Sequence, residues 1–145
     1  PDGLTVARVL AGGLPLAQAL HHRVSDSRTI ADHGRPLEDV TLLAPLQPAS
    51  VRDFVTFEEH VEGVSAGVEG KSNVADEWYQ APTFYFTNPH TILGPDQEVS
   101  PPVTERLDFE LEVAVVIGDV AGSTGSNLDA EQAAAHIFGY TIMND

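Results

Sequence analysis

The pattern of hydrophobic and polar positions is most regular between residues 107 and 118, LDFELEVAVVIG. Side chains of a β-strand point alternately to its two faces, so three acidic residues share one face and three apolar residues share the other. The unbroken apolar run at 114–117 predicts burial on both faces, and Gly118 closes the strand. The alternating residues are Asp108, Glu110 and Glu112 on one face, and Phe109, Leu111 and Val113 on the other.

Four further segments have the composition of strands, with aromatic or β-branched residues bounded by turn residues. They are Leu4–Leu10, Val40–Ala44, Thr83–Phe86 and Phe138–Asp145. The last segment has apolar Ile142 and Met143 near the end of the chain, although a strand needs neighbours to pair its backbone and to cover its faces. This pattern predicts that the chain is a fragment of a longer protein.

Two helices are expected outside the centre of the chain. Leu16–His22 fits a short helix or an irregular apolar segment. Ala130–Ile137 is an alanine-rich helix with Asp129 at its N-cap, Gln132 in the capping-box position and Gly139 as its stop. Because this helix lies between two predicted strands in a chain rich in short strands, the fold class is predicted to be α+β.

A third helix is predicted to begin at Ser50, which is a good N-cap with Asp53 in the capping-box position, and to end at Gly63. Asp53 and His60 would then lie on one side of this helix, almost two turns apart. Each residue has two interpretations. Asp53 is either a capping residue or a ligand, and His60 is either a surface histidine near a helix C-terminus or a catalytic group.

Polar and glycine-bearing stretches separate these elements at residues 25–39, 63–76 and 119–128, and are predicted to be loops. The stretch at 63–76 directly follows the candidate catalytic His60, which is where an active-site lid would lie, but it is equally typical of an ordinary loop. Trp78 and Tyr79 are expected to anchor its far end in the core.

Composition narrows the possible functions. The 145 residues carry a formal charge of −15, which excludes nucleic acid and anionic membrane surfaces as expected partners, because both require basic patches. The absence of cysteine excludes thiol catalysis, thiolate metal sites and disulfides, and is compatible with the cytoplasm. No segment has the length and hydrophobicity of a transmembrane helix. Lys71 is the only lysine, so a cation in a site must come from an arginine, from Lys71 or from a metal.

Glu110 and Glu112 are a carboxylate pair at the start of an apolar run, and such charges are costly to bury without compensation. A divalent cation provides this charge compensation, since Mg²⁺ and Ca²⁺ prefer carboxylate oxygens. The alternative interpretation is a solvated strand face, because half-exposed antiparallel strands often carry acids on their outer side. The spacing alone favours the solvated face, so this motif is weak when taken in isolation.

Four segments in order resemble the fumarylacetoacetate hydrolase superfamily, and the similarity spans about residues 40–145. They are DFVTFEEH at 53–60, PTFYFTNPHTILGP at 82–95, LDFELEVAVVIG at 107–118 and HIFGYTIMND at 136–145. The resemblance implies a mixed β-sheet roll of the fumarylacetoacetate hydrolase type, here truncated. It further implies that residues 1–39 are a small variable N-terminal domain and residues 40–145 the first half of the catalytic domain.

The resemblance also implies roles for individual residues. Glu110, Glu112 and Asp145 match the family's metal ligands, and Asp53 matches a further aspartate ligand of the hydrolases proper. The implied ion is a divalent metal, with Mg²⁺ preferred and Mn²⁺ or Ca²⁺ as alternatives. In addition, His60 matches the histidine that acts as general base in hydrolytic members, and Tyr85 matches a tyrosine that contacts the substrate.

The chain departs from the family pattern at two places. Thr87 and Asn88 stand where many members have a lysine, so one expected cation for the substrate is missing. The carboxylate partner of His60 is also open, because neither Glu59 nor Glu62 has the commonest spacing.

The resemblance implies a metal-dependent enzyme that hydrolyses a C–C bond in a β-diketo acid, either an acylpyruvate or a fumarylacetoacetate-like acid. It implies a small oxo-acid substrate and a homodimer. The expected location is the cytoplasm. An isomerase, decarboxylase or dehydratase acting on a 2-keto acid through the same enolate chemistry is the alternative within the enzyme class. A non-catalytic acidic calcium-binding or structural domain is the alternative outside it, although the chain contains no EF-hand loop.

Overall fold

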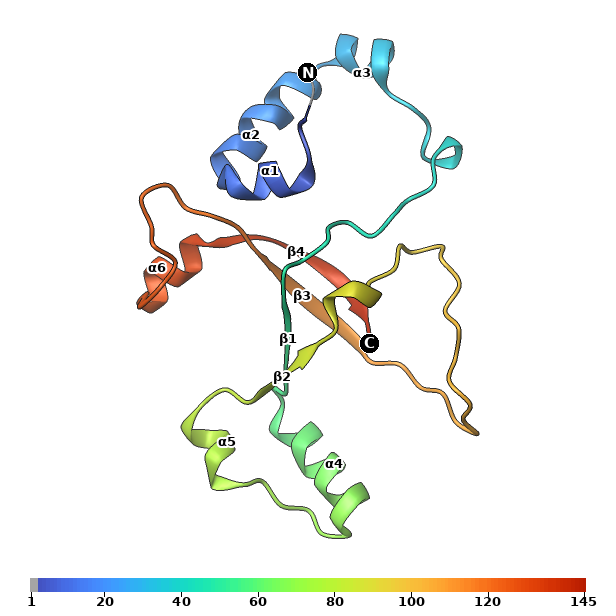
Figure 1. Cartoon of the computed structure of the whole chain (residues 1–145), viewed down its shortest axis with the longest axis vertical. Coiled ribbons are helices and arrows are strands. Elements are labelled where there is room, and N and C mark those ends of the chain that lie inside the picture. Colours follow the sequence, from blue (N-terminus) through green and yellow to red (C-terminus); the bar gives the residue numbers. More distant parts are fainter. Residues whose placement is uncertain (1–2) are drawn as a thin grey trace. The chain divides into compact units, whose positions relative to one another are not determined.

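The computed structural model describes residues 3–145 and divides the chain into two compact units. One unit combines the chain up to Leu46 with Gly94–Asp145, and the other is Gln47–Leu93. Figure 1 labels their helices and strands along the chain. Both units combine helices with a two-stranded antiparallel sheet, so the chain is of mixed α and β structure, as predicted.

The first unit begins with two short helices, α1 (Val6–Ala11) and α2 (Gly13–Val24). The strand predicted at Leu4–Leu10 is therefore wrong, whereas the helical interpretation of Leu16–His22 is confirmed. Apolar Val6, Val9 and Leu10 have the spacing of one helical face. The side chain of Thr5 accepts a hydrogen bond from the Arg8 backbone N–H at 3.3 Å and so caps α1.

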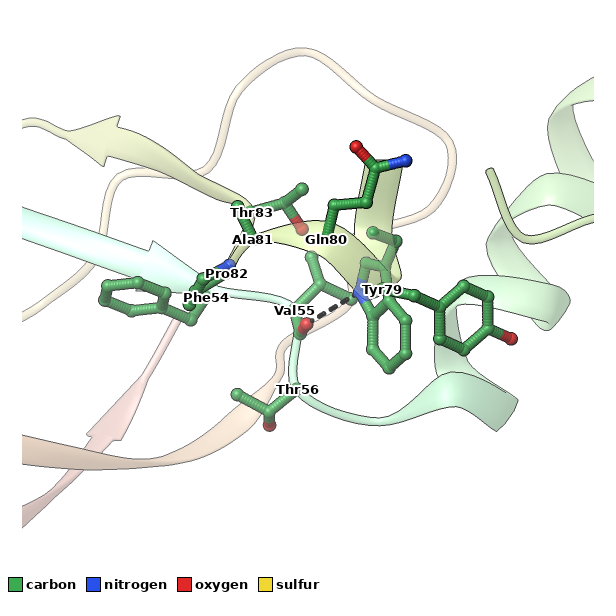
Figure 2. Close-up of a pocket in the computed structure, with 9 residues that line it drawn as sticks. Phe54, Val55, Thr56, Tyr79, Gln80, Ala81, Pro82 and Thr83 are labelled. Carbon is green, nitrogen blue, oxygen red and sulfur yellow. Dashed lines mark hydrogen bonds between the residues drawn. The ribbon is translucent and has the colours of Figure 1, made fainter. Parts of the chain in front are cut away.

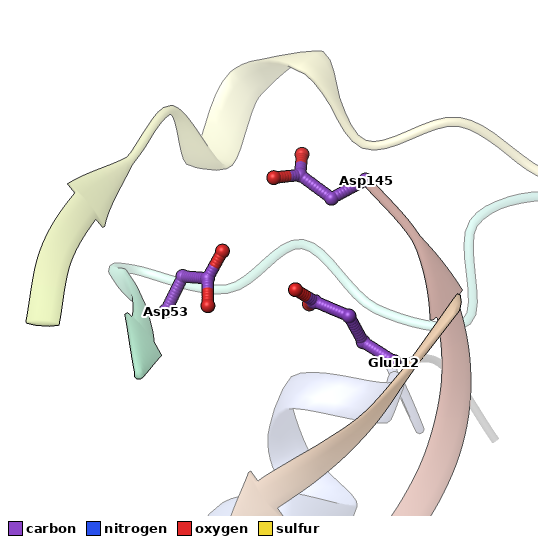
Figure 3. Close-up of side chains that lie close together, drawn as sticks. All are labelled: Asp53, Glu112 and Asp145. Atoms are coloured by element: carbon purple, nitrogen blue, oxygen red, sulfur yellow. The ribbon is translucent and has the colours of Figure 1, made fainter. Parts of the chain in front are cut away.

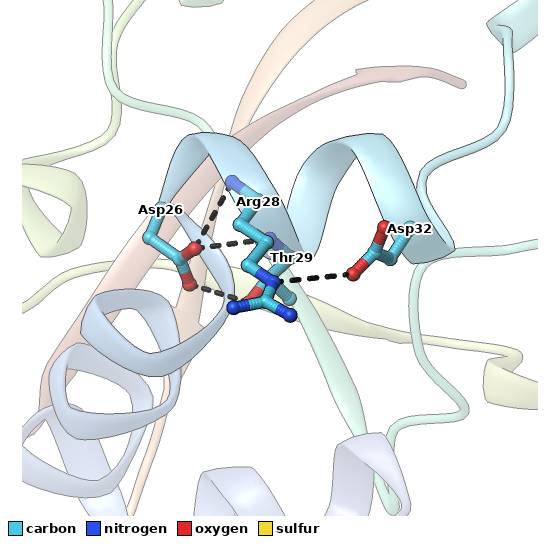
Figure 4. A network of polar contacts seen from close by, with 4 residues as sticks. All are labelled: Asp26, Arg28, Thr29 and Asp32. Carbon is cyan, nitrogen blue, oxygen red and sulfur yellow. Dashed lines mark hydrogen bonds and ion pairs between the residues drawn. The ribbon is translucent and has the colours of Figure 1, made fainter.

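Helix α3 (Ser27–His33) lies within the stretch predicted to be a loop, and this prediction is wrong. The Asp26 carboxylate accepts hydrogen bonds from the backbone N–H groups of Arg28 and Thr29 at 3.1 and 2.9 Å, and from the Thr29 hydroxyl (Figure 4). The hydrogen bond from the Thr29 side chain is the largest of the effects that lower the pKa of Asp26. The start of this helix is thus fixed by its cap, which a loop interpretation of a polar segment overlooks.

No strand forms at Val40–Ala44, contrary to prediction, and the 3₁₀ helix η1 (Leu37–Asp39) precedes this segment. The backbone of residues 40–44 passes close to Gly94, where an added Cβ would lie 2.6 Å from the Leu42 carbonyl oxygen. The segment has no strand partner among residues 3–145, and an unpaired stretch cannot form a sheet.

The sheet of the first unit is the antiparallel hairpin of β3 (Leu111–Ile117) and β4 (Ile137–Asn144). β4 confirms the prediction at the end of the chain. β3 begins four positions later than the predicted strand, although the backbone hydrogen bonds continue outward to Glu110 and Asp145. The ladder is irregular between Val116 and Ile117.

Only one face of β3 is partly covered. Glu112, Ala114 and Val116 are half-buried, while the side chains between them remain exposed. The predicted burial of residues 114–117 on both faces is therefore wrong within the described part of the chain, since Val115 and Ile117 are 47% and 60% exposed. An apolar run shows that a strand has two apolar faces, but it does not supply the elements that would cover them.

Helix α6 (Ala130–Ala135) links the hairpin strands and has the predicted capping box. The Asp129 carboxylate accepts from the Gln132 backbone at 2.8 Å, and the Gln132 side chain accepts from the Asp129 backbone at 3.0 Å. The helix ends before His136, so the predicted stop at Gly139 is wrong. Gly139 instead lies in β4 opposite Val116.

Residues 119–128 form neither a helix nor a strand, which confirms the predicted loop. His136 attaches this segment to the hairpin. This is a buried polar side chain, and both of its ring nitrogens are used. Nδ1 lies 2.9 Å from the Gly118 carbonyl oxygen, and Nε2 lies 2.8 Å from the Ser123 hydroxyl. The Gly118 contact requires an N–H at Nδ1, so Nε2 accepts the Ser123 proton.

The second unit contains β1 (Val51–Phe54), α4 (Glu58–Glu69), α5 (Asp76–Gln80), β2 (Phe84–Thr87) and the 3₁₀ helix η2 (Pro89–Thr91). β2 confirms the strand predicted at Thr83–Phe86, which ends before Asn88 and Pro89 as expected. Its partner β1 replaces the start of the helix predicted from Ser50.

The first part of the helix predicted for residues 50–63 is wrong because pairing with β2 outweighs a local capping signal, whereas residues 58–63 are helical as predicted. Phe54 lies opposite Phe84, and their ring centroids are 5.2 Å apart. Helix α4 starts at Glu58 and continues through Gly63 to Glu69, so the first half of the loop predicted at 63–76 is helical. Gly70 ends the helix in the left-handed region at φ 72°.

Trp78 and Tyr79 were predicted to anchor the far end of the 63–76 stretch, and only Trp78 is partly buried. Trp78 donates from its ring nitrogen to the Val55 carbonyl at 3.0 Å and is half-buried (Figure 2). Tyr79 is 59% exposed and donates its hydroxyl hydrogen to Glu58 of α4, so it does not lie in a core. None of the described helices combines the length and the apolar character needed to cross a membrane.

Candidate metal centre

The first unit brings two predicted ligands together through the register of its hairpin. Glu110 and Asp145 exchange backbone hydrogen bonds of 2.7 and 2.9 Å, so they stand directly opposite one another. Directly opposed side chains lie on one face, and Glu112 shares that face two positions further on, diagonally from Asp145. Carboxylate oxygens of Glu112 and Asp145 lie within 4.8 Å of each other (Figure 3).

The donor set of this pair suits a hard divalent cation. Both residues offer only carboxylate oxygens, the ligands preferred by Mg²⁺, Mn²⁺ and Ca²⁺. Glu112 is half-buried and Asp145 exposed, and two carboxylates this close repel one another unless a cation or proton offsets their charge. Glu110 lies on the same face by register, but its oxygens are not among the described carboxylates that approach within 4.8 Å.

The second unit places two other predicted site residues side by side. Asp53 on β1 is directly opposite Tyr85 on β2, so their side chains share a face of this sheet. Asp53 is half-buried and Tyr85 is 50% exposed. Asp53 does not cap a helix and does not share a helix with His60, so the predicted arrangement of these two residues is wrong.

A third side chain on this face was identified in the sequence only as a departure from the family pattern. Thr87 lies two positions after Tyr85, and its hydroxyl oxygen is buried without a hydrogen-bond partner among residues 3–145. A buried hydroxyl without a partner is costly, so it marks a place where a ligand atom would be stabilised. No pattern in the sequence signals this property, because it depends on burial.

His60 lies in the first turn of α4 and is exposed. Its backbone N–H bonds to the Phe57 carbonyl at 3.1 Å, as expected at a helix start. Within the described residues no hydrogen bond joins its ring to Glu59 or Glu62, so the structure does not supply the carboxylate partner that the sequence left open.

The neighbouring Glu58 instead binds Tyr79. This hydrogen bond is the main cause that raises the pKa of the Tyr79 hydroxyl, with smaller contributions from burial and from the charges of Glu58, Glu62 and Asp76. The start of α4 is therefore an acidic environment that raises the pKa of this tyrosine.

Comparison with known proteins places the chain in a family. Residues 49–145 match the family described as fumarylacetoacetate (FAA) hydrolase C-terminal. The chain therefore belongs to the fumarylacetoacetate hydrolase family, as its motifs predicted. The relatives described next include a hydrolase and a tautomerase, so their names give two different reactions.

Three relatives illustrate the similarity. Fumarylacetoacetase from Oryza sativa subsp. japonica is 26% identical over 126 residues, which cover 76% of this chain and 29% of the relative. Oxaloacetate tautomerase YisK from Bacillus subtilis (strain 168) is 30% identical over 111 residues, covering 75% of this chain and 34% of that protein. The mitochondrial oxaloacetate tautomerase FAHD2B from Homo sapiens is 41% identical over 56 residues, or 38% of this chain and 17% of that protein.

The chain spans about a third of the length of the curated relatives that it matches over most of its own length. No solved structure matches it. The two-unit arrangement of helices and small antiparallel sheets agrees with an α+β class, while the complete roll of the family and the domain division at residue 40 stay predictions.

Proposed function

We propose that this chain carries the metal-binding part of an enzyme that hydrolyses a C–C bond in a β-diketo acid. The observation that carries the proposal is the hairpin register, which gathers Glu110, Glu112 and Asp145 on one face in a member of this family. Glu112 and Asp145 are the first pair of ligands, and Glu110 and Asp53 are the further ligands implied by the resemblance.

The expected ion is Mg²⁺, with Mn²⁺ or Ca²⁺ as alternatives, because every proposed ligand atom is a carboxylate oxygen. Such an ion, when bound, supplies a Lewis acid that stabilises negative charge developing on a substrate oxygen. It also reverses the local potential in a chain whose formal charge of −15 would otherwise repel an anionic oxo-acid.

In this proposal, side chains of the second unit bind the substrate and transfer a proton, as the resemblance implies. Tyr85 and Thr87, on the Asp53 face of the β1–β2 sheet, are hydroxyl donors for the oxygens of an oxo-acid. His60 accepts a proton from the water that attacks the distal carbonyl, a role that suits an imidazole near neutral pH. In this proposal Thr87 provides a neutral hydrogen bond where many relatives have a lysine.

Isomerisation of a 2-keto acid is the second candidate, and two observations favour it. Two of the relatives described above are oxaloacetate tautomerases. In addition, the His60 ring has no hydrogen bond to Glu59 or Glu62 among the described residues, whereas a hydrolytic base is expected to be oriented by a carboxylate. Decarboxylation or dehydration through the same enolate belongs to this candidate, and dimerisation through a second copy stays a prediction.

The rival outside the enzyme class is a non-catalytic acidic domain that binds calcium or has a structural role. Metal titration alone does not distinguish this domain from an enzyme, because both bind a metal ion. Binding of a substrate that occurs only in the presence of the metal does distinguish them. Two experiments therefore measure metal binding and substrate turnover separately.

We expect Glu112→Gln to weaken Mg²⁺ binding by at least about tenfold, because an amide keeps the size of the side chain and removes its charge. Isothermal titration calorimetry of the whole chain measures this, and Glu105→Gln, a change at an exposed acid of the same unit, is the control that should leave binding unchanged. Equal affinity in Glu112→Gln and the unaltered chain would contradict the proposed centre.

The reaction is assigned with a panel of acylpyruvates and oxaloacetate, assayed with the chain and with a longer protein that contains it. Loss of acylpyruvate cleavage in His60→Ala would support hydrolysis. Undiminished turnover of oxaloacetate in His60→Ala, without cleavage of any acylpyruvate, would support the isomerase and overturn the hydrolase. Metal binding without turnover or substrate affinity in either protein would leave the non-catalytic domain.

A further inference from the structure

A serine and a histidine beside the β3–β4 hairpin are joined by a hydrogen bond that the proposed enzyme function does not use. The Ser123 hydroxyl lies 2.8 Å from Nε2 of His136, and both residues belong to the first unit. His136 directly precedes β4 and Asp145 directly follows it, so these two residues lie roughly 30 Å apart along the strand at about 3.3 Å per residue. The serine–histidine pair is therefore separate from the carboxylate centre.

The His136 ring has the orientation and the tautomer that a general base requires. Its Nδ1 lies 2.9 Å from the Gly118 carbonyl oxygen, which accepts the hydrogen of that nitrogen. Nε2 therefore carries a lone pair that faces the Ser123 hydroxyl. Because the side chain is buried, at 9% exposure, the ring is not free to turn into solvent. A nucleophile bonded to a base that a third group orients is the arrangement by which proteins activate a hydroxyl.

The hydrogen bonds of the Ser123 hydroxyl leave its oxygen able to attack. A hydroxyl has one hydrogen to donate and two lone pairs. The hydrogen is donated to His136, and the Gly125 backbone N–H donates to one lone pair at 3.1 Å. Within the described part of the chain no third group bonds to this oxygen, so the second lone pair is available. The Gly125 N–H also stabilises the negative charge that develops on the oxygen as its proton leaves.

The position of Ser123 determines which reagents reach it. The residue is exposed, and it lies between Gly122 and Gly125, where an added Cβ would meet no atom within 4 Å, so neither glycine crowds the hydroxyl. The formal charge of −15, with Asp119 and Asp129 on either side of this loop in the sequence, repels anionic donors such as organic phosphates. An uncharged carboxylic ester meets no such repulsion.

We infer that Ser123 is a site of covalent acylation, activated by His136 and reactive towards uncharged activated esters. The serine Oγ forms a bond to the ester carbonyl carbon, and the bond between that carbon and the alcohol oxygen breaks. The hydroxyl proton passes to Nε2 of His136 and from there to the leaving alcoholate, so the products are an acyl-serine and a free alcohol. The step needs no metal ion, and it therefore holds or fails independently of the proposed enzyme function.

Reaction of the whole chain with p-nitrophenyl acetate, in buffer that contains EDTA, tests the inference. Ser126 is an internal control, because it is exposed in the same loop and its hydroxyl lies 3.3 Å from that of Thr124 instead of contacting a base. We expect Ser123 to be acetylated at least about tenfold faster than Ser126, since a positioned general base commonly contributes about 100-fold or more.

Fragmentation mass spectrometry locates the acetyl group. Both serines lie in the 107–145 peptide that trypsin releases at Arg106, so their acetylation is compared within one molecule. If the histidine only fastens the loop to the hairpin, Ser123 has the reactivity of any exposed serine. Equal acetylation of Ser123 and Ser126 would therefore overturn the inference.

His136→Gln tests the role of the base, because glutamine keeps a hydrogen-bond acceptor but does not take up a proton. Acetylation of Ser123 should fall to the rate of Ser126 in this variant. His90→Gln, at an exposed histidine of the second unit, is the control and should leave the Ser123 rate unchanged. An undiminished Ser123 rate in His136→Gln, with the circular dichroism of the unaltered chain, would overturn the role of His136. If His136→Gln does not fold, the comparison of the two serines in the unaltered chain decides.

Discussion

Tyr79 and Glu58 form a pair whose ionisation is coupled to the folded state. The hydroxyl donates to the carboxylate, so deprotonation of the tyrosine would place two negative charges together, and the pKa of Tyr79 is raised above its ordinary value of 10.0. A group with a raised pKa stabilises the fold at pH values below its unfolded pKa. This contribution is lost as the pH rises through the folded-state pKa.

We expect Glu58→Gln to return the pKa of Tyr79 toward its ordinary value, because the substitution removes the largest cause of the shift. Glu62→Gln is the matched control on the same helix. It removes only a charge that acts at a distance, so its effect should be smaller. Spectrophotometric titration, with Tyr79→Phe subtracted to isolate this tyrosine among the three, measures both values. Equal shifts in the two glutamine variants would contradict the assignment to the hydrogen bond.

The candidate metal ligands show how far single residues can be predicted from sequence. The spacing of Glu110 and Glu112 correctly places them on one face of the chain, because alternation is a local property. The approach of Asp145 depends on the register of β4 against β3, and only the family motifs indicated it. The buried hydroxyl of Thr87 could not be predicted, since burial depends on contacts that the sequence does not display.

At the scale of elements, local signals succeeded where no competing partner exists. α6 begins where it was predicted, with its capping box, and β2 and β4 overlap most of their predicted ranges. The capping signal at Ser50 failed because β1 pairs with β2 over four residue pairs, a contact that the sequence does not display. The strand predicted at Leu4–Leu10 failed because a loose alternation and a helical spacing both fit the same apolar residues.

The turn between α1 and α2 depends on a glycine. Gly13 has φ +66°, and a Cβ at this position would lie 2.4 Å from the carbonyl oxygen of Asp119, the residue after Gly118. The Asp119 N–H bonds to Leu10 in α1 at 3.0 Å, so the backbone on both sides of the close approach is held in place. A side chain here requires a backbone shift in the first unit.

We expect Gly13→Ala to lower the free energy of unfolding by about 2–4 kcal/mol, from a left-handed conformation and a backbone clash together. Gly122→Ala is the control, because Gly122 has φ +82° but no atom within 4 Å of its added Cβ. It should cost only about 1–2 kcal/mol. Urea denaturation followed by circular dichroism gives both values, and a loss for Gly13→Ala no greater than for Gly122→Ala would contradict the clash.

At the scale of the whole molecule, the described residues contain no buried hydrophobic side chain. The uncovered side chains of the hairpin form one apolar face across both strands, because residues opposite one another in the register share a face. Members of this face are 47–75% exposed, and they are Leu111, Val113, Val115, Ile117, Tyr140 and Ile142. Contiguous apolar surface of this kind binds hydrophobic dyes and other apolar surfaces.

We expect Val113→Lys to reduce the fluorescence of a bound hydrophobic dye, because Val113 lies in the middle of this face and is 73% exposed. Stability should change by no more than about 0.5 kcal/mol, since an exposed side chain leaves no cavity. Val64→Lys on α4, at a residue that is 52% exposed, is the control and should leave most of the dye signal. An unchanged signal in Val113→Lys would show that the dye binds elsewhere.

The alternation of the β3–β4 hairpin has a consequence for how its sequence can vary in length. Loss or gain of one residue within β3 would exchange the acidic and apolar sides beyond that point and separate Glu112 from Asp145. A change of two residues would preserve the sides. The strands should therefore accept an odd length change only where a bulge absorbs the extra residue, as between Val116 and Ile117, whereas the 119–128 segment, which has no such parity, can accept odd changes throughout.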